Sequence, residues 1–345
     1  MAQLLNRRII LKTRATGLPT PDLFEMVEDN APKPGDGELL VHSIYLSADP
    51  AMKGWIGSTK NYASVETGAT MNSFGLGVVV ESRHPDYAEG DFVSCQTGWQ
   101  EYAVARPDDV AFRKVDPADG PVSTALGVLG LNGITAYFGL LDVGQPKAGA
   151  TVLVSTAAGA VGSAVGQIAK IKSCHTVGIT GGPEKTALCR DVFGYDEVID
   201  YKATDDLGTA LQSACPEGID IYYDNVGGDT LDTVLPLMNM HGRISICGTA
   251  SVDAWLPPPT GLRPERHILV SRLRIQGFII FDYFDRYPEA LANLKQWISE
   301  GKLKYREDIA EGLENAPSVL AGLYEGRNMG RQLIRIRPDP TLQES

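Results

Sequence analysis

Short apolar runs that end at small or polar residues recur along the second half of the chain, and helical patterns separate most of them. The runs lie at residues 151–154, 175–180, 197–201, 219–224, 243–247 and 273–280. Stretches with helical spacing of apolar residues lie between them at 184–193, 204–215 and 230–239, and a further one follows at 286–300. Alternation of this kind is typical of a parallel sheet with helices on both faces. The pattern predicts an α/β fold with a doubly wound parallel sheet.

The first part of the chain has a different pattern, with short strands separated by turns. Strands are expected at 39–46, 75–81, 91–95 and 100–105, with glycine and proline between them. Such a series predicts an antiparallel barrel or sandwich. Residues 126–141 are apolar and rich in glycine, as expected for a helix-containing linker. A last strand is expected at 332–337, and it can return to the first domain.

The turn after the first apolar run of the second half consists of small residues. Ala157, Gly159 and Gly162 have the spacing of G-x-G-x-x-G, with alanine in the first position. A strand, a small-residue turn and a helix bring the free N–H groups of a helix N-terminus to a phosphate. The alternative is a tightly packed turn without a ligand. The strand–helix units that follow favour a nucleotide.

The end of the next strand indicates which nucleotide. NAD enzymes carry an acidic residue there, about twenty residues after the glycines, for the ribose hydroxyl. This chain has Gly181 and Gly182 instead, followed by Lys185. Room and a cation suit a 2′-phosphate, so NADP(H) is favoured over NAD(H). The alternative for Lys185 is a solvated helix residue paired with Glu184 or Asp191.

Composition and charge narrow the possible partners. The 345 residues exceed the usual size of one core, so two domains are expected. A net charge of −12 disfavours nucleic acid and anionic membranes as partners. No stretch approaches the roughly 20 apolar residues of a membrane span, and no signal-peptide pattern is present, so the cytoplasm is expected.

Cysteine and histidine usage disfavours a metal site. The five cysteines are scattered singly, without a C-x-x-C pair, which fits a reducing compartment. The five histidines are equally dispersed. A catalytic zinc needs three clustered ligands. We therefore expect no metal.

Several specific stretches accompany the glycine turn. They include Asp224-Asn-Val-Gly-Gly228, Gly277-Phe-Ile-Ile280, Tyr45-Leu-Ser-Ala-Asp-Pro50 and Gly139-Leu-Leu-Asp-Val-Gly-Gln-Pro146. With these stretches, nearly the whole chain resembles the zinc-independent medium-chain dehydrogenase/reductases. Within that family it is most similar to the leukotriene/prostaglandin reductases, plant double-bond reductases and bacterial NADPH-dependent curcumin reductases. The bacterial group is the most similar of these.

The resemblance implies a domain organisation. A GroES-like, β-rich catalytic domain comprises residues 1–130 and 303–345, and a Rossmann dinucleotide-binding domain comprises residues 131–302. The resemblance also implies a homodimer, because relatives use the edge of the sixth strand, 273–280, as a subunit interface. An exposed strand edge is a pairing liability that such an interface removes.

The resemblance further implies which residues surround NADP(H). Those at the pyrophosphate are Gly159, Ala160, Val161 and Gly162, with Asn328 reaching back to the phosphates. Those at the 2′-phosphate end are Lys185 and Tyr201, beside the room left at Gly181. Those toward the ribose and nicotinamide are Asn225, Cys247, Gly248, Phe278, Ile279 and Ile280.

The activity that the resemblance implies is reduction of the carbon–carbon double bond of α,β-unsaturated carbonyl compounds, by hydride transfer to the β-carbon. Charge that builds on the carbonyl oxygen needs a hydrogen-bond donor. Tyr62, on a long loop, and Tyr45 are the candidate catalytic residues, besides a cofactor ribose hydroxyl. A half-buried strand tyrosine is the alternative for Tyr45. Quinone reduction, or NADPH binding without turnover, are the alternative functions.

The chain departs from the family pattern at two places. Relatives carry a tyrosine in a Ser-x-Tyr-Asn sequence after the fifth strand, whereas this chain has Val252 or Asp253 there. Relatives often read Pro-Tyr-Met-Arg where this chain has Pro50-Ala-Met-Lys53. A larger substrate pocket, or one of different polarity, is the expected consequence.

Overall fold

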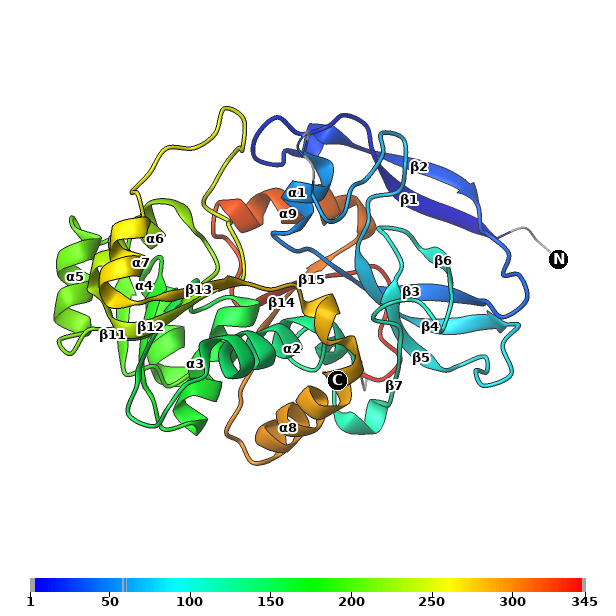
Figure 1. The fold of residues 1–345 in the computed structure, drawn as a ribbon. Helices are drawn as coiled ribbons and strands as arrows, with labels where there is room; N and C mark the ends of the chain where they lie inside the picture. Colours follow the sequence, from blue (N-terminus) through cyan, green and yellow to red (C-terminus); the bar gives the residue numbers. More distant parts are fainter. Residues whose placement is uncertain (1–3, 58, 60, 343–345) are drawn as a thin grey trace. The chain divides into compact units, whose positions relative to one another are not determined.

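The computed structural model describes residues 4–57, 59 and 61–342, which divide into two units (Figure 1). Unit 1 runs to Gly130 and includes Glu307–Asn328 and the chain from Gln332 onward. Unit 2 comprises Leu131–Arg306 and Met329–Arg331. Each unit has its own sheet and its own apolar core.

Unit 2 contains the predicted doubly wound parallel sheet. Its six strands are β8 (Thr151–Ser155), β9 (His175–Thr180), β10 (Glu197–Asp200), β11 (Ile219–Asp224), β12 (Met238–Ile246) and β13 (Arg274–Gly277). The strand order is β10-β9-β8-β11-β12-β13, and the pairs are parallel. From β8 the chain adds β9 and β10 on one side, and then returns to add β11, β12 and β13 on the other side. The strand order therefore reverses between β8 and β11. Ligands of such sheets bind outside the carboxyl ends of the strands at this point.

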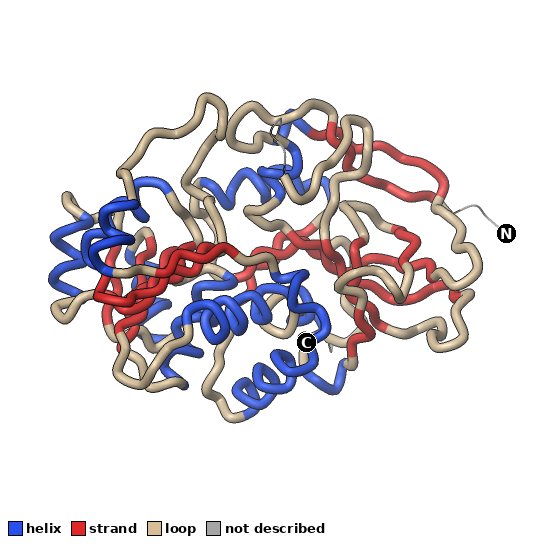
Figure 2. Tube along the Cα trace, in the orientation of Figure 1, coloured by secondary structure: helices blue, strands red, loops and turns tan. Residues whose placement is uncertain are grey.

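Helices cover both faces of this sheet, as Figure 2 shows in blue on either side of the red strands. They are α2 (Leu131–Phe138), α3 (Ala160–Ile171), α4 (Pro183–Ala187), α5 (Leu207–Ala214), α6 (Gly228–Val234), α7 (Glu265–Ser271) and α8 (Tyr287–Ser299). One core contains Leu153, Val177 and Tyr222 of the sheet with Leu211 of α5 and Val234 of α6. Among the described residues, no helix combines the length and apolar character needed to cross a membrane.

Several predicted element boundaries in unit 2 are wrong. The strand expected at 243–247 begins earlier, since β12 is Met238–Ile246. The helix expected at 184–193 is α4 followed by a π-helical segment, η5 (Leu188–Val192). The helix expected at 230–239 ends in a 3₁₀ turn, η6 (Leu235–Leu237), because Pro236 cannot continue an α-helix, and β12 begins at Met238. The strand expected at 273–280 is shorter, since β13 is Arg274–Gly277. It ends there because Gly277 pairs with Ile246, the last residue of β12, and this partner strand does not continue beyond it.

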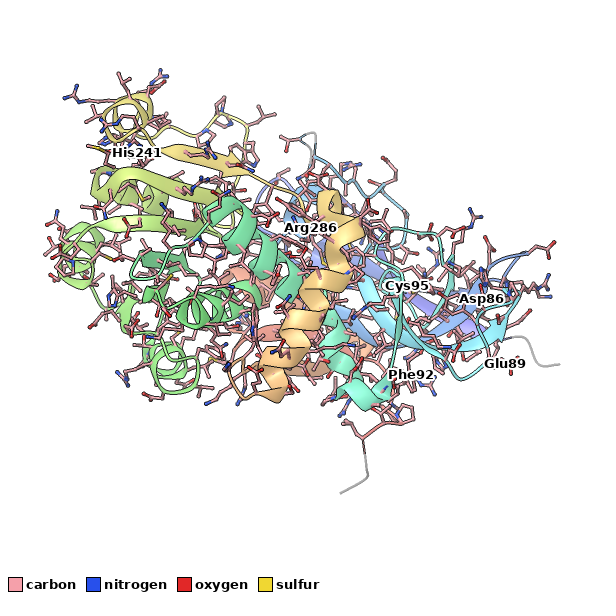
Figure 3. The ribbon with its side chains drawn as sticks, turned by 60° about the horizontal axis from the view of Figure 1, so that its bottom comes forward. Asp86, Glu89, Phe92, Cys95, His241 and Arg286 are labelled. Atoms are coloured by element: carbon pink, nitrogen blue, oxygen red, sulfur yellow. The ribbon has the colours of Figure 1, made fainter. Side chains whose placement is uncertain are left out.

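Unit 1 is the predicted β-rich, antiparallel domain. Its main sheet contains β3 (Leu39–Ser47), β4 (Phe74–Ser82), β5 (Phe92–Gln96), β6 (Tyr102–Ala105), β7 (Arg113–Val115), β14 (Glu307–Glu311) and β15 (Arg331–Arg335). The path is β14-β15-β3-β4-β5-β7, and β6 also pairs with β3. Figure 3 shows Phe92 and Cys95 on β5, with Asp86 and Glu89 in the turn before it. The tail strand expected at 332–337 is β15, which pairs antiparallel with β3.

Unit 1 also contains elements that the sequence pattern did not predict. A separate antiparallel pair, β1 (Leu5–Leu11) and β2 (Phe24–Asn30), was missed because most of its side chains are polar or exposed. The helices of unit 1 are α1 (Met52–Ile56) and α9 (Ala316–Tyr324). The remaining short helical turns are η1 (Pro21–Leu23), η2 (Pro117–Asp119), η3 (Val122–Leu126), η8 (Leu313–Asn315) and, in unit 2, η4 (Gly139–Gly144) and η7 (Ile280–Arg286).

Candidate functional site

The turn between β8 and α3 leaves backbone donors without a protein acceptor. The N–H of Gly159 bonds to Thr156 O at 2.8 Å, and the first intrahelical bond runs from the Ser163 N–H to Gly159 O at 3.0 Å. Gly159 is the N-cap and has no side chain to accept a bond. Within the described residues, the N–H groups of Ala160, Val161 and Gly162 therefore have no acceptor in the protein. Three such donors at a positive helix end suit a phosphate.

Glycine in this turn also serves close packing. A Cβ on Gly162 would lie 2.3 Å from Thr156 O, so a side chain there would displace the turn. Four residues later, a Cβ on Gly166 would lie 2.1 Å from the ring of Tyr195, whose hydroxyl donates to Gly162 O at 2.6 Å. The small residues of the fingerprint thus bring α3 close to the sheet and leave its N-terminus uncovered.

A segment from the C-terminal part of the chain lies against the same turn. Gly330 forms a parallel bridge with Gly159, and its N–H donates to Ala158 O at 3.1 Å. A Cβ on Gly330 would lie 2.2 Å from Arg306 O, so only glycine fits here. Asn328 comes two residues before Gly330 in the chain.

The ends of β9 and β10 form a second group. Gly181 lies directly under the ring of Tyr201, because a Cβ on Gly181 would be 2.7 Å from Tyr201 Cε1 and 3.1 Å from Lys202 Cε. The Asp200 carboxylate accepts the N–H of Gly182 at 2.8 Å and that of Lys202 at 3.0 Å. Lys185 lies in the first turns of α4, after Gly182. The group combines two lysines, an exposed phenol and glycine backbone, which suits a phosphate monoester.

Asn225 follows β11 and is held by the end of β8. Its N–H donates to Ser155 Oγ at 2.8 Å, and its side-chain amide donates to Ser155 O at 2.7 Å. The side chain of Asn225 is therefore oriented by the backbone of the neighbouring strand.

Cys247 and Gly248 follow β12 and are held by the end of β11. Their N–H groups donate to Asp224 O at 2.8 and 3.1 Å. A Cβ on Gly248 would lie 2.9 Å from Asn225 O, so the two loops are in close contact. Burial raises the pKa of the Cys247 thiol to about 12, so the thiol stays protonated at neutral pH.

Phe278, Ile279 and Ile280 lie just beyond β13. The ring centroid of Phe278 is 6.4 Å from that of Tyr223, and a Cβ on Gly139 would lie 2.4 Å from Phe278 Cζ. Ile279 is 37% exposed, and Ile280 begins η7. These three residues therefore form a short apolar segment at the carboxyl end of the sheet.

Arg286, at the end of η7, fixes this segment to the rest of unit 2. Its guanidinium pairs with Asp142 and Glu289 and lies 4.7 Å from the ring centroid of Phe138 (Figure 3). The segment that begins at Phe278 is thus anchored at its far end by charge and by a cation–π contact.

The two candidate catalytic tyrosines belong to unit 1 and differ in environment. Tyr45 is 1% exposed, and its hydroxyl donates to Asp339 Oδ2 at 3.0 Å. Burial and the Asp339 carboxylate raise the pKa of Tyr45. Tyr62 is 56% exposed, and its ring lies edge-on to Trp55 with 6.3 Å between centroids. The hydroxyl of Tyr45 is already used inside unit 1, whereas the ring of Tyr62 faces outward.

Metal ligands do not gather in the part of the chain that the structure describes. No group of three or more histidine, cysteine, aspartate or glutamate side chains is placed to hold a metal ion there. The five cysteines are free thiols.

Three residues at the strand ends were not predicted as site residues. Lys202 directly follows the predicted Tyr201, and its side chain lies over Gly181, so two cations follow the β9 and β10 ends instead of one. Asp200 organises that group through backbone N–H bonds. Asp224 is the buried last residue of β11. The basic residue after Tyr201 was visible in the sequence, but the bonds of the two aspartates were not.

Two family models match the chain, one over each part. The model described as "N-terminal domain of oxidoreductase" matches residues 7–112. The model described as "Zinc-binding dehydrogenase" matches residues 160–296, which begin at the first residue of α3 and include the ends of β9 to β12.

Similar proteins match over nearly their whole length. The NADPH-dependent curcumin reductase of Escherichia coli (strain K12) is 45% identical over 342 residues, which cover 97% of this chain and 98% of that protein. The NADP⁺-dependent 2-alkenal reductase of Nicotiana tabacum is 40% identical over 337 residues, which cover 96% and 97%. The crystal structure of CurA from Vibrio vulnificus in complex with NADPH has a TM-score of 0.90 at 40% identity and covers 96% of this chain and 100% of that one.

Proposed function

Because the chain belongs to the medium-chain dehydrogenase/reductase family, in the group that contains the NADPH-dependent curcumin and 2-alkenal reductases, we propose that it reduces the carbon–carbon double bond of α,β-unsaturated ketones and aldehydes. The enzyme is an NADPH-dependent oxidoreductase. Membership in a group of named reductases decides against the alternative of NADPH binding without turnover.

The observation that carries the proposal is that three groups of residues follow the carboxyl ends of the strands of the parallel sheet. The open N–H groups at the start of α3 suit the pyrophosphate. The lysines and Tyr201 beyond β9 and β10 suit the 2′-phosphate. The loops after β11 and β12, with the apolar segment after β13, suit the ribose and the nicotinamide ring. These three groups support NADPH as the cofactor through its phosphates and its nicotinamide end.

The reaction needs little acid–base machinery from the protein. NADPH, when bound, would supply the hydride that adds to the β-carbon of the substrate while negative charge develops on the carbonyl oxygen. A proton then adds to the α-carbon, so the products are the saturated carbonyl compound and NADP⁺. The protein orients the two reactants and provides a hydrogen-bond donor where negative charge develops.

We assign that donor to Tyr62. Tyr62 is 56% exposed on a loop, and its ring lies edge-on to Trp55, so a small molecule can approach it. The competing candidate, Tyr45, is buried with its hydroxyl bonded to Asp339. A donor that acts on substrate must reach it, which favours Tyr62.

The loop after Cys247 supports a substrate range that differs from that of relatives. It lacks the family tyrosine and instead contains Trp255 and Leu256, which are 49% and 68% exposed. We propose that this loop favours bulky, apolar enones as substrates.

Steady-state assays with three acceptors test the proposed function. NADPH oxidation is followed with a 2-alkenal, with an aryl enone such as 4-phenyl-3-buten-2-one, and with 1,4-benzoquinone. The proposal requires turnover of the alkenal or the enone with formation of the saturated product. Turnover of the quinone alone would make the protein a quinone reductase.

We also propose a homodimer formed through the edge of β13. This strand pairs with β12 on one side and ends the described sheet. Met240 of β12 and Leu269 and Val270 of α7 are 58%, 76% and 55% exposed, and a partner would cover such apolar side chains. Light scattering after size-exclusion chromatography tests this, and a mass of one chain at micromolar concentration would contradict it.

The cytoplasm remains our proposal for the location. The five cysteines are free thiols, and four of them are buried. A reducing compartment keeps such thiols unpaired. Fractionation of cells with immunodetection of the protein tests this, and recovery outside the cytoplasmic fraction would contradict it.

A further inference from the structure

Asp224, the last residue of β11, holds its own following loop through one carboxylate oxygen. Its Oδ1 accepts the N–H of Val226 at 2.9 Å and that of Gly227 at 2.8 Å. The hydroxyl of Tyr222 donates to the same oxygen at 2.9 Å. Gly227 has a φ of 68°, a left-handed conformation that the two N–H bonds hold in place.

The backbone and side chain of Asp224 also connect its strand to both neighbours. Asp224 O accepts the N–H groups of Cys247 and Gly248 at the end of β12, at 2.8 and 3.1 Å. On the other side, Ser155 Oγ at the end of β8 lies 3.5 Å from Asp224 Oδ1 and accepts the N–H of Asn225. Three strand ends that carry predicted cofactor residues thus meet at one aspartate.

Asp224 is buried, unlike an exposed aspartate that only connects two surface segments. Its relative exposure is 0%, and its second oxygen, Oδ2, has no hydrogen-bond partner in the described part of the chain. A buried carboxyl group with an unpartnered oxygen is costly, so a site that keeps it needs a compensating benefit. The bonds to Oδ1 provide that benefit, because two of them, from the N–H groups of Val226 and Gly227, fix the geometry of the loop.

We propose that Asp224 is a positioning residue for the nicotinamide end of the cofactor site. Its side chain acts through the Val226–Gly227 loop and through Ser155, which orients Asn225, rather than by touching the reactants. This inference rests on the proposed function, which places the nicotinamide at these loops. The adenosine end of the site, at Gly181 and Tyr201, lies across β8 at the ends of β9 and β10 and shares none of the hydrogen bonds of Asp224. Loss of Asp224 therefore weakens one half of the site and not the other.

Asp220 offers a matched control in the same strand. Its carboxylate accepts the N–H of Thr151 at 2.8 Å and the side-chain amide of Asn239 at 2.9 Å. It thus connects the beginning of β11 to the beginnings of β8 and β12. The cofactor loops follow the opposite, carboxyl ends of these strands. The Asp220→Ala variant tests whether loss of hydrogen bonds between strands weakens cofactor binding by itself.

The experiment measures binding of three probes to the full-length enzyme by calorimetry: NADPH, reduced nicotinamide mononucleotide and 2′,5′-ADP. For Asp224→Ala we expect NADPH and the nicotinamide mononucleotide to bind about ten- to a hundredfold more weakly, as for lost bonds to a buried carboxylate. Binding of 2′,5′-ADP should stay within about threefold of the wild type, and Asp220→Ala should leave all three within that range. Asp224→Asn keeps an oxygen acceptor at Oδ1 and should restore nicotinamide binding to within about threefold.

Each result supports or contradicts the inference. Equal loss of all three probes in Asp224→Ala, or unchanged binding of the nicotinamide probe, would overturn it. If Asp224→Ala does not fold, Asp224→Leu decides, because its side chain has a similar shape and no acceptor for the loop N–H groups. An equal change in the binding of both half-cofactors would then contradict the inference. Failure of the proposed function is separate, since it appears as a wild-type enzyme that binds NADPH but does not reduce an enone.

Discussion

The side chain of Lys202 lies across the backbone of Gly181, joining the ends of two neighbouring strands. A Cβ on Gly181 would approach Lys202 Cε to 3.1 Å, and Asp200 accepts backbone N–H groups from both sides of this contact. The carboxylate at the end of β10 is therefore occupied by the backbone, and the side-chain charge around Gly181 is contributed by lysine.

This arrangement predicts the cofactor selectivity of two lysine variants. Lys185→Ala and Lys202→Ala should each raise the KM for NADPH about tenfold and leave the KM for NADH unchanged, because only NADPH carries the 2′-phosphate. Lys170→Ala is the matched control, because Lys170 lies in the last turn of α3 and pairs with Asp196 at 2.6 Å. An equal rise for both cofactors would assign these lysines to general stability instead.

Packing of α3 predicts a stability effect at Gly166. An added methyl group would lie 2.1 Å from the buried ring of Tyr195, which cannot move without breaking its bond to Gly162 O. Gly166→Ala should lower the free energy of unfolding by about 1–3 kcal/mol, measured by urea denaturation. Gly277→Ala in the same unit has no atom within 4 Å of the new Cβ and should change stability little. Equal stability of the two variants would mean that α3 can shift away from Tyr195.

Tyr62→Phe tests the assignment of the hydrogen-bond donor. The variant should reduce kcat on an aryl enone by about one to two powers of ten, as for loss of one donor to the developing oxyanion. Tyr102→Phe is a control in the same unit, because the ring of Tyr102 stacks on His42 with 4.1 Å between centroids. An unchanged kcat in Tyr62→Phe would refute the assignment, and loss in Tyr45→Phe would transfer it to Tyr45.

His42 predicts a pH dependence of stability. Burial and the neighbouring Arg337, whose Nη1 is 2.6 Å from His42 Nδ1, lower the pKa of His42 from 6.5 to about 4, although Glu101 acts in the opposite direction. The neutral form is therefore favoured in the folded state. Its contribution to stability is complete above the unfolded pKa of 6.5 and is lost as the pH falls toward 4.

Comparison with His42→Gln isolates this contribution. The wild type should lose about 1–2 kcal/mol more than the variant between pH 7.5 and pH 4, after allowance for solvent screening. Denaturation curves at both pH values measure the difference. Parallel loss of stability in both proteins would show that His42 does not titrate in this range.

The sequence predicted the parts of the fold that depend on local patterns. Alternating runs around residues 151–280 gave the parallel sheet, because a strand buried on both faces must be apolar throughout. The polar pair β1 and β2 was missed, since its residues have no such pattern. The end of β13 was set by its partner: pairing stops at Ile246, and no property of residues 278–280 reveals it.

In the candidate site, too, residues that depend on a local pattern were predicted, and residues that depend on tertiary contacts were not. Gly159 and Gly162 were visible because a helix N-terminus near a phosphate requires small residues. Lys202 was missed because its role depends on a contact with Gly181 at the end of another strand. Asp224 was missed because the residue pattern does not show that its carboxylate accepts bonds from Tyr222 and from the loop that follows it. The difference between Tyr45 and Tyr62 was likewise hidden, since Asp339, the acceptor of Tyr45, is 294 residues away.

The position of the transferred hydrogen tests the central claim most directly. The enzyme is incubated with 4-phenyl-3-buten-2-one and NADPH that carries deuterium at both C4 positions, and the product is examined by NMR and mass spectrometry. The proposed function predicts the saturated ketone with one deuterium at the β-carbon. An allylic alcohol with deuterium at the former carbonyl carbon, or a saturated ketone without deuterium at the β-carbon, would contradict it.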